Sequence, residues 1–236
     1  MLKASKTALK KFIVPSLITF LVLLADQSLK IWVKLNMYLG QEYFIFGDWF
    51  RLHFTENPGM AFGMTLGGEY GKIILSLFRI FAVLFIAGYM RVLMKNKSAP
   101  GLIVSLSFIL AGALGNIIDS VLYGLVFSDS INKLATFMPE AGGYATLFHG
   151  KVVDMLYFPV FQGFIPSWIP IWGDSFQIFF RPVFNIADAA ITVGVAMIMV
   201  FQKRYFKEEE NPDEPIEADR DTNEPATSEA ASERAS

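Results

Sequence analysis

The chain has 236 residues, of which 53% are apolar and 15% aromatic, and its formal net charge is −2. This apolar content is too high for an ordinary soluble domain and predicts several membrane spans. The sequence has no Cys, no HExxH, no GxSxG and no glycine-rich phosphate loop, and its bases do not cluster among aromatic residues, so we expect no thiol chemistry, metal, cofactor or nucleic acid.

Four apolar stretches predict an all-α membrane protein with four transmembrane helices. The predicted helices cover residues 12–25 with a continuation to 33, residues 72–94, residues 100–124 and residues 183–201. Their hydrophobic cores approach the roughly 20 residues that a bilayer-spanning helix needs. Two lysines precede the first stretch as in a signal peptide, but no small-x-small cleavage site follows, so we interpret it as an uncleaved span.

The segments that follow the first and third spans predict a small extracytoplasmic β platform and an aromatic insert. In FRLHFTEN, residues 50–57, Phe50, Leu52 and Phe54 alternate with polar residues, which is the period of a half-buried strand. The preceding YFIFGDWF is predicted to pair with this strand as a hairpin. The aromatic insert, residues 157–182, is expected to form an interfacial lid or helix.

The distribution of basic residues predicts that both termini are cytoplasmic. Bases precede the first span, join the second to the third, and follow the fourth: Lys3, Lys6, Lys10, Lys11, Arg91, Lys95, Lys97, Lys203, Arg204 and Lys207. All four Trp residues then fall on the outer side, where an aromatic belt is expected: Trp32, Trp49, Trp168 and Trp172.

The last 29 residues differ from the rest of the chain in charge. Residues 208–236 contain 11 acids and 2 bases and have no aromatic residue, whereas the other 207 residues carry a net charge of +7. We therefore predict one membrane domain, residues 1–207, and a disordered acidic cytoplasmic tail, residues 208–236.

Polar residues inside the predicted spans gather toward their outer ends. They are Asp26, Lys30, Asn116, Asp119, Asn185 and Asp188, and Asn57 and Asp154 are predicted in the outer loops. Asp26 and Lys30 are four residues apart and share a helix face, as do the two Asn-x-x-Asp pairs. An Asn beside a carboxylate can donate a hydrogen bond to it. We expect these side chains to converge on one pocket.

Several outer carboxylates in a chain without Cys or a metal motif favour acid-protease chemistry. Two close carboxylates share one proton, so one activates water while the other polarises the scissile carbonyl. Without the motifs, Asp188 is equally consistent with a helix N-terminal acid, and Asp154 fits a solvated loop acid better than a catalytic one. Asp174 is a rival for the second catalytic acid. Arg79, inside the second span, is expected to snorkel to the outer surface rather than to meet a lipid phosphate.

Two other functions are compatible with intramembrane acids. A small transporter or proton-coupled carrier also places acids in its spans, although no internal repeat is visible here. A non-catalytic scaffold that binds through the aromatic outer loops would tolerate Asn at both Asp154 and Asp188.

Five motifs in order resemble the lipoprotein signal peptidases (signal peptidase II), which are aspartyl proteases of bacterial membranes. The motifs are DQSLKIWVK at 26–34, NPGMAFG at 57–63, GALGNIID at 112–119, KVVDML at 151–156 and FNIADAAI at 184–191. The resemblance implies that Asp154 and Asp188 are the catalytic dyad. It implies that the site is supported by Asp26, Lys30, Asn57, Gly59, Ala61, Asn116, Asp119, Asn185 and Ala187.

The resemblance also implies a substrate and a location. The substrate is a prolipoprotein whose lipobox Cys carries diacylglycerol, and the enzyme cuts on the N-terminal side of that Cys. The site is expected at the extracytoplasmic face of the bacterial inner membrane, in contact with lipids, where globomycin-like peptides would inhibit it.

The chain departs from the family pattern at several positions. Met60 stands where Ala is commoner, and Ser120 follows Asp119 where the family usually has Arg. We expect Lys151 or Arg181 to replace the missing positive charge. Asp154 lies 35 residues after Asp119 and 34 before Asp188, and both separations are longer than expected for the family.

Overall fold

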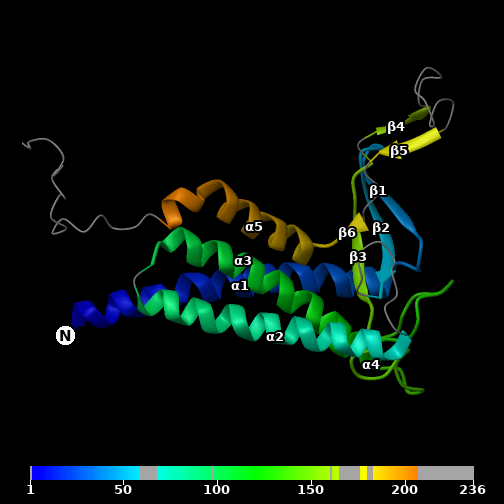
Figure 1. Cartoon of the computed structure of the whole chain (residues 1–236). Helices are drawn as coiled ribbons and strands as arrows, with labels where there is room; N and C mark the ends of the chain where they lie inside the picture. Colours follow the sequence, from blue (N-terminus) through cyan, green and yellow to red (C-terminus); the bar gives the residue numbers. More distant parts are fainter. Residues whose placement is uncertain are drawn as a thin grey trace, which may run out of the picture. The chain divides into compact units, whose positions relative to one another are not determined.

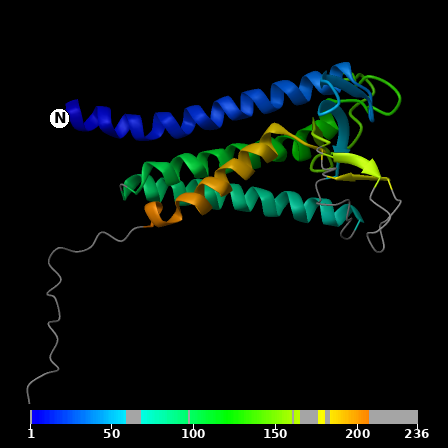
Figure 2. The same cartoon turned by 90° about the horizontal axis from the view of Figure 1, so that it is seen from above.

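The long helices lie side by side, with an antiparallel sheet across one end (Figures 1 and 2). This computed structural model describes residues 2–58, 68–96, 98–159, 161–164, 176–179 and 183–206. The side chains of residues 2–11, 68–70, 161–164 and 176–179 are outside the description. We call the end of the helices that meets the sheet the sheet end.

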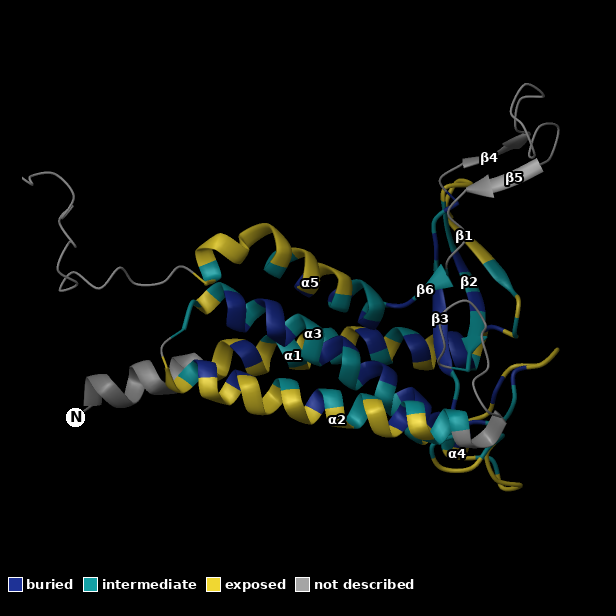
Figure 3. Cartoon of the chain, viewed as in Figure 1, coloured by how far each residue is buried: buried dark blue, intermediate teal, exposed yellow. Residues whose placement is uncertain are grey.

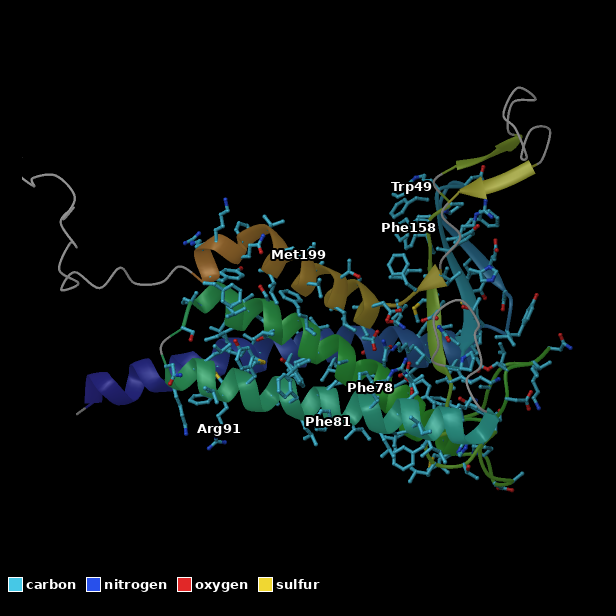
Figure 4. All side chains as sticks on the ribbon, in the orientation of Figure 1. Trp49, Phe78, Phe81, Arg91, Phe158 and Met199 are labelled. Atoms are coloured by element: carbon cyan, nitrogen blue, oxygen red, sulfur yellow. The ribbon has the colours of Figure 1, made fainter. Side chains whose placement is uncertain are left out.

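In the part of the chain that the structure describes, four helices are long and apolar enough to cross a membrane, which confirms the four predicted spans. They are α1 (Leu2–Asn36), α2 (Gly68–Lys95), α3 (Pro100–Ile118) and α5 (Ile186–Tyr205), and α3 continues through a π-helical turn, η2 (Asp119–Tyr123), into α4 (Gly124–Val126). Exposed apolar side chains such as Phe78, Phe81 and Met199 cover the outward faces of α2 and α5, as on a lipid-facing surface (Figures 3 and 4).

The fourth helix begins later than predicted. Val183–Phe184 form a short strand, β6, and Asn185 is the N-cap of α5, with its side chain accepting a hydrogen bond from the Asp188 amide. Asn185 and Asp188 therefore lie at the start of the helix, where free backbone N–H groups and the helix dipole favour acceptors and negative charge.

Helix α3 lies at the centre of the bundle and contacts α1, α2 and α5. Half of the residues in the most apolar stretch of its span are buried, compared with 11–17% in the other three spans. The GALG run makes this close packing possible, because a Cβ on Gly112 would overlap the carbonyl of Ala187 and a Cβ on Gly115 would lie 2.7 Å from Asp26 Oδ2. These two glycines bring α3 against both α5 and α1.

The sheet has four strands in the order β1–β2–β3–β6, and each neighbouring pair is antiparallel. Strands β1 (Glu42–Phe46) and β2 (Phe50–Asn57) form the predicted hairpin. Strand β3 (Val152–Tyr157) pairs with β2, so that Thr55 lies opposite Asp154. Asn57 ends the strand predicted over residues 50–57. The alternative interpretation of Asp154 as a solvated loop acid is wrong, because the short run VVDML is a central strand buried on both faces.

The aromatic insert contains strands where the sequence suggested a lid or helix. In its described residues, β4 (Phe161–Phe164) pairs antiparallel with β5 (Phe176–Phe179), so the helix alternative is wrong for these residues. Phe158, at the start of the insert, stacks on Phe50 and lies near Trp49 (Figure 4). Trp168, Trp172, Asp174 and Arg181 lie outside the described residues, as does the predicted tail.

We predict that Gly112→Val destabilises the protein by about 1–3 kcal/mol, because the added methyl groups force α3 away from α5. Gly88→Val is the matched control, since no atom lies within 4 Å of a Cβ at that helical glycine. Thermal unfolding in detergent measures the difference, and equal melting temperatures for the two variants would contradict the packing described here.

Candidate active site

The polar residues of four separate segments meet at the sheet end of the bundle, where the buried residues of the helices adjoin the sheet (Figure 3). Helix α1 contributes Asp26 and Lys30, and the α3–η2 junction contributes Asn116 and Asp119. Strand β3 contributes Asp154, and the start of α5 contributes Asn185 and Asp188. The contacts among these residues form two linked layers, an ion cluster and a pair of aspartates.

Lys30 is the centre of the ion cluster. Its Nζ lies 2.8 Å from Asp26 Oδ2 and 2.8 Å from Asp119 Oδ2, and it donates to Asn116 Oδ1 at 3.1 Å. The three charged side chains are at most 1% exposed. Asp26 also accepts from the Ala187 amide at 2.8 Å, so the cluster ties α1 to α3 and to the first turn of α5.

Gln27 completes this cluster and was not assigned a role from the sequence. Its Nε2 donates to Asp119 Oδ1 at 3.0 Å and to the Gly115 carbonyl at 3.2 Å, and its Oε1 accepts from the Tyr123 hydroxyl at 3.1 Å. Asp119 also accepts from the Val153 amide at 3.2 Å, which fixes β3 relative to α3. Sequence spacing does not reveal Gln27, because residues i and i+1 of a helix do not normally share a face.

Two amide side chains hold the two aspartates. Asn185 Nδ2 donates to Asp154 Oδ1 at 2.7 Å, and Asn116 Nδ2 donates to Asp188 Oδ1 at 2.8 Å. The two amides are also linked, because Asn185 Nδ2 lies 3.2 Å from Asn116 Oδ1. Each carboxylate therefore has its own amide donor, and the donors form one network connected to Lys30.

The two aspartates have different environments. Asp154 is 4% exposed, whereas Asp188 is half-buried. Burial, together with the negative charge of Asp188, raises the pKa of Asp154 to about 7, although hydrogen bonds from Asn185 and Asn57 act in the opposite direction. The two carboxyl groups therefore differ in burial, and the surroundings of Asp154 favour its protonated form.

A second buried ion cluster fixes the sheet to the helices. Lys34 Nζ lies 2.7 Å from Glu56 Oε1 and 4.9 Å from the ring centroid of Tyr144, and Lys151 Nζ lies 2.9 Å from Glu56 Oε2. Burial opposes the charge of Glu56, but the two lysines outweigh it and lower the pKa of this carboxyl. Lys34 lies four residues after Lys30 and therefore on the same face of α1, which is the sequence signal for its place beside the first ion cluster.

Two expectations about positive charge are corrected. Arg79 does not snorkel to the surface, because its Nη1 donates to Ser120 Oγ at 3.1 Å. Lys151 is paired with Glu56 in the second ion cluster, and its predicted role in replacing the missing arginine is not supported. The other expected replacement, Arg181, lies outside the described residues.

The remaining predicted site residues are placed only in part. Asn57 ends β2, and its side chain is hydrogen-bonded to Asp154. Ala187 is fully buried and packs against Gly115, where an added Cβ would lie 3.2 Å from the Ala187 Cβ. Gly59 and Ala61, like Met60, lie outside the described residues. Within the described part of the chain, no group of three or more His, Asp or Glu side chains is arranged to hold a metal ion.

These features define a membrane protein with four spanning helices and a carboxylate site at one end of the bundle. The family model described as signal peptidase (SPase) II matches residues 18–203. A lipoprotein signal peptidase of Porphyromonas gingivalis is 48% identical over 185 residues, which cover 78% of this chain and 80% of that protein. One from Amoebophilus asiaticus is 38% identical over 194 residues, which cover 81% and 78%.

A solved structure described as a bacterial membrane enzyme shares the fold, with a TM-score of 0.53 and 22% identity, over 84% of this chain and 93% of that one. The match to the family model and the similarity to curated relatives show that this chain belongs to the signal peptidase II family of proteases. Family membership favours the protease over the transporter and the scaffold that the sequence also allowed.

We predict that Lys30→Met destabilises the fold by about 3–5 kcal/mol, because it leaves Asp26 and Asp119 buried without their cation. The measurement is thermal or denaturant unfolding in detergent. Lys133→Met is the control, since Lys133 is 58% exposed and its ion pair with Asp129 lies on the surface. A Lys30→Met variant as stable as the control would show that the cluster is not required for the fold.

Proposed function

We propose that the protein is an aspartic endopeptidase that removes the signal peptide from diacylglyceryl-modified prolipoproteins by cutting on the N-terminal side of the lipidated Cys. The observation that carries the proposal is the pair Asp154 and Asp188, held by separate amides in unequal environments. The substrate follows from the signal peptidase II family and from relatives named lipoprotein signal peptidase.

In the proposed mechanism, Asp154 is protonated and Asp188 is ionised in the resting enzyme. Asp188 takes a proton from a water molecule, and the water oxygen bonds to the scissile carbonyl carbon. Asp154 gives its proton to the carbonyl oxygen, which forms a neutral tetrahedral diol. The proton on Asp188 then passes to the leaving nitrogen of the Cys, the C–N bond breaks, and the diol returns a proton to Asp154 as the new carboxyl group forms.

The amide network supports this mechanism by keeping the two carboxylates in place while protons move. Asn185 binds both Asp154 through its Nδ2 and the Asp188 backbone through its Oδ1. Because Asn185 is also the N-cap of α5, one side chain fixes Asp154 relative to the start of the helix that carries Asp188. Such preorganisation reduces the rearrangement that the reaction needs.

The proposed location follows from the arrangement of charge along the helices. Arg91, Lys95, Lys203 and Arg204 all lie near the ends of α2 and α5 away from the sheet, which supports a cytoplasmic position for these ends under the positive-inside rule. The dyad would then face the extracytoplasmic side of the bacterial inner membrane. There, the acyl chains of the substrate stay in the bilayer, and globomycin-like peptides are expected to inhibit.

Asp154→Asn and Asp188→Asn are each predicted to reduce cleavage of a purified diacylglyceryl-prolipoprotein at least about 100-fold, because each removes one proton carrier. Asn keeps a side-chain oxygen that accepts the hydrogen bonds from Asn185 and Asn116, so both variants should fold. Mass analysis of the product tests whether the cut precedes the lipidated Cys.

Asp129→Asn serves as the control for this pair, since Asp129 is a surface acid bonded to Lys133. If both dyad variants still cut at the wild-type rate, the assignment is wrong, and Asp119 and Asp174 become the next candidates. If the wild-type enzyme does not cut this substrate at all, the proposed function itself fails.

The pH dependence provides a separate prediction. Since the pKa of Asp154 is raised to about 7, kcat/KM should fall as pH rises through about 7, by about tenfold per unit once the proton is lost. The raised pKa of Asp154 also contributes to the free energy of unfolding. This contribution is fully present at pH values below the ordinary pKa of an Asp, and it is lost as pH rises through about 7. Melting curves at each pH therefore show whether activity falls because Asp154 loses its proton or because the protein unfolds. A kcat/KM that stays constant up to pH 9 would contradict the role of Asp154.

A further inference from the structure

We propose that Arg79, on helix α2, is a positioning residue for the aspartate pair. Held by its hydrogen bond to Ser120, it supplies a second positive charge that offsets the negative charge of the carboxylates. This inference rests on the proposed function, because it assigns a role within the same reaction. Arg79 does not belong to any of the five motifs, and it lies inside a membrane-spanning helix.

The direction of the Arg79 side chain is the first argument. Its neighbours Phe78 and Phe81 are 66% and 68% exposed and cover the lipid-facing side of α2 (Figure 4). Arg79 is only half-buried, but its Nη1 donates to Ser120 Oγ at 3.1 Å, on the buried side of the bundle. A charged side chain in a span is costly unless it faces the protein interior and finds partners there.

The second argument is the short chain of contacts from Arg79 to the dyad. Ser120 is buried, and its Oγ donates to the Asn116 carbonyl at 2.9 Å. The Asn116 side chain in turn donates to Asp188 at 2.8 Å. Two residues, Ser120 and Asn116, thus connect the guanidinium of Arg79 to Asp188, the more exposed aspartate of the pair.

The third argument is the charge of the site. Lys30 is placed between Asp26 and Asp119, 2.8 Å from each, so one positive charge already serves two negative ones. An ionised Asp188 adds a third negative charge in a region of low dielectric, where unbalanced charge is expensive. The guanidinium of Arg79 reduces this excess without displacing Lys30.

Ser120 explains why the cation comes from α2. The resemblance to signal peptidase II places an arginine directly after Asp119, and this chain has the small Ser120 there. A serine leaves both space and a hydroxyl acceptor for a guanidinium that reaches across from the neighbouring helix. Ser120 thus holds the guanidinium of Arg79 where the resemblance implies a positive charge.

The test compares Arg79→Met, Arg79→Lys and the double variant Arg79→Met/Ser120→Arg with the wild type. Arg79→Met should lower kcat about 10–100-fold with little change in KM, because the residue balances charge and does not bind substrate. Arg79→Lys should retain part of the lost activity. The double variant should recover most of it, because the positive charge returns from position 120. Arg91→Met, twelve residues along the same helix, is the matched control and should match the wild type.

A second readout is independent of cleavage. Infrared spectra, with Asp154→Asn as the reference, follow the protonated carboxyl of Asp154 as pH is raised. Removing a nearby positive charge favours the protonated form, so the midpoint in Arg79→Met should move to higher pH by at least about half a unit. The falling limb of the activity profile should move by the same amount.

The outcomes separate this inference from the proposed function. A wild-type enzyme that does not cut the lipidated substrate contradicts the proposed function. The pH midpoint at which Asp154 loses its proton does not depend on cleavage, so it still tests the role of Arg79. An unchanged midpoint in Arg79→Met overturns the inference. A loss of activity that neither lysine nor Ser120→Arg restores also overturns it, because a purely structural contact with Ser120 would then explain the result.

Discussion

The ion cluster around Lys30 is the interaction on which the rest of the structure depends. A charged ammonium group buried in a helical bundle is tolerated only when its partners are close and satisfied, and here both carboxylates lie 2.8 Å away. Those partners bring three helices together, since Asp26 also binds the first turn of α5 through the Ala187 amide. Any change that separates α1, α3 and α5 therefore leaves a buried charge without its partner.

The properties of the aspartate pair follow from the elements that hold it. Asp154 lies in a central strand that packs against the helices, so it is deeply buried, whereas Asp188 lies in the first turn of α5, where it is half-buried. Burial, together with the negative charge of Asp188, raises the pKa of Asp154 toward neutrality. The π-helical turn begins at Asp119, whose carboxylate contacts both Lys30 and the backbone of β3.

The second ion cluster and the glycines of α3 have a supporting role that reaches the same site. Glu56 joins Lys34 at the end of α1 to Lys151 at the start of β3, so the strand that carries Asp154 is attached on both sides. Gly112 and Gly115 let α5 and α1 approach α3 until the hydrogen bonds between them can form. Charge and close packing thus act together, because neither ion cluster tolerates a wider separation of the helices.

The sequence by itself determined the four spans and the β1–β2 hairpin, because these depend on the local periodicity and length of apolar runs. It also indicated that the polar residues of the spans lie toward one end. Only the tertiary structure decided that Asp154 is in a strand, that Asn185 caps α5, and that Arg79 contacts Ser120. The physical reason is that burial, capping and ion pairing at these residues depend on segments up to 161 residues apart, as between Asp26 and Ala187, and no local pattern encodes such contacts.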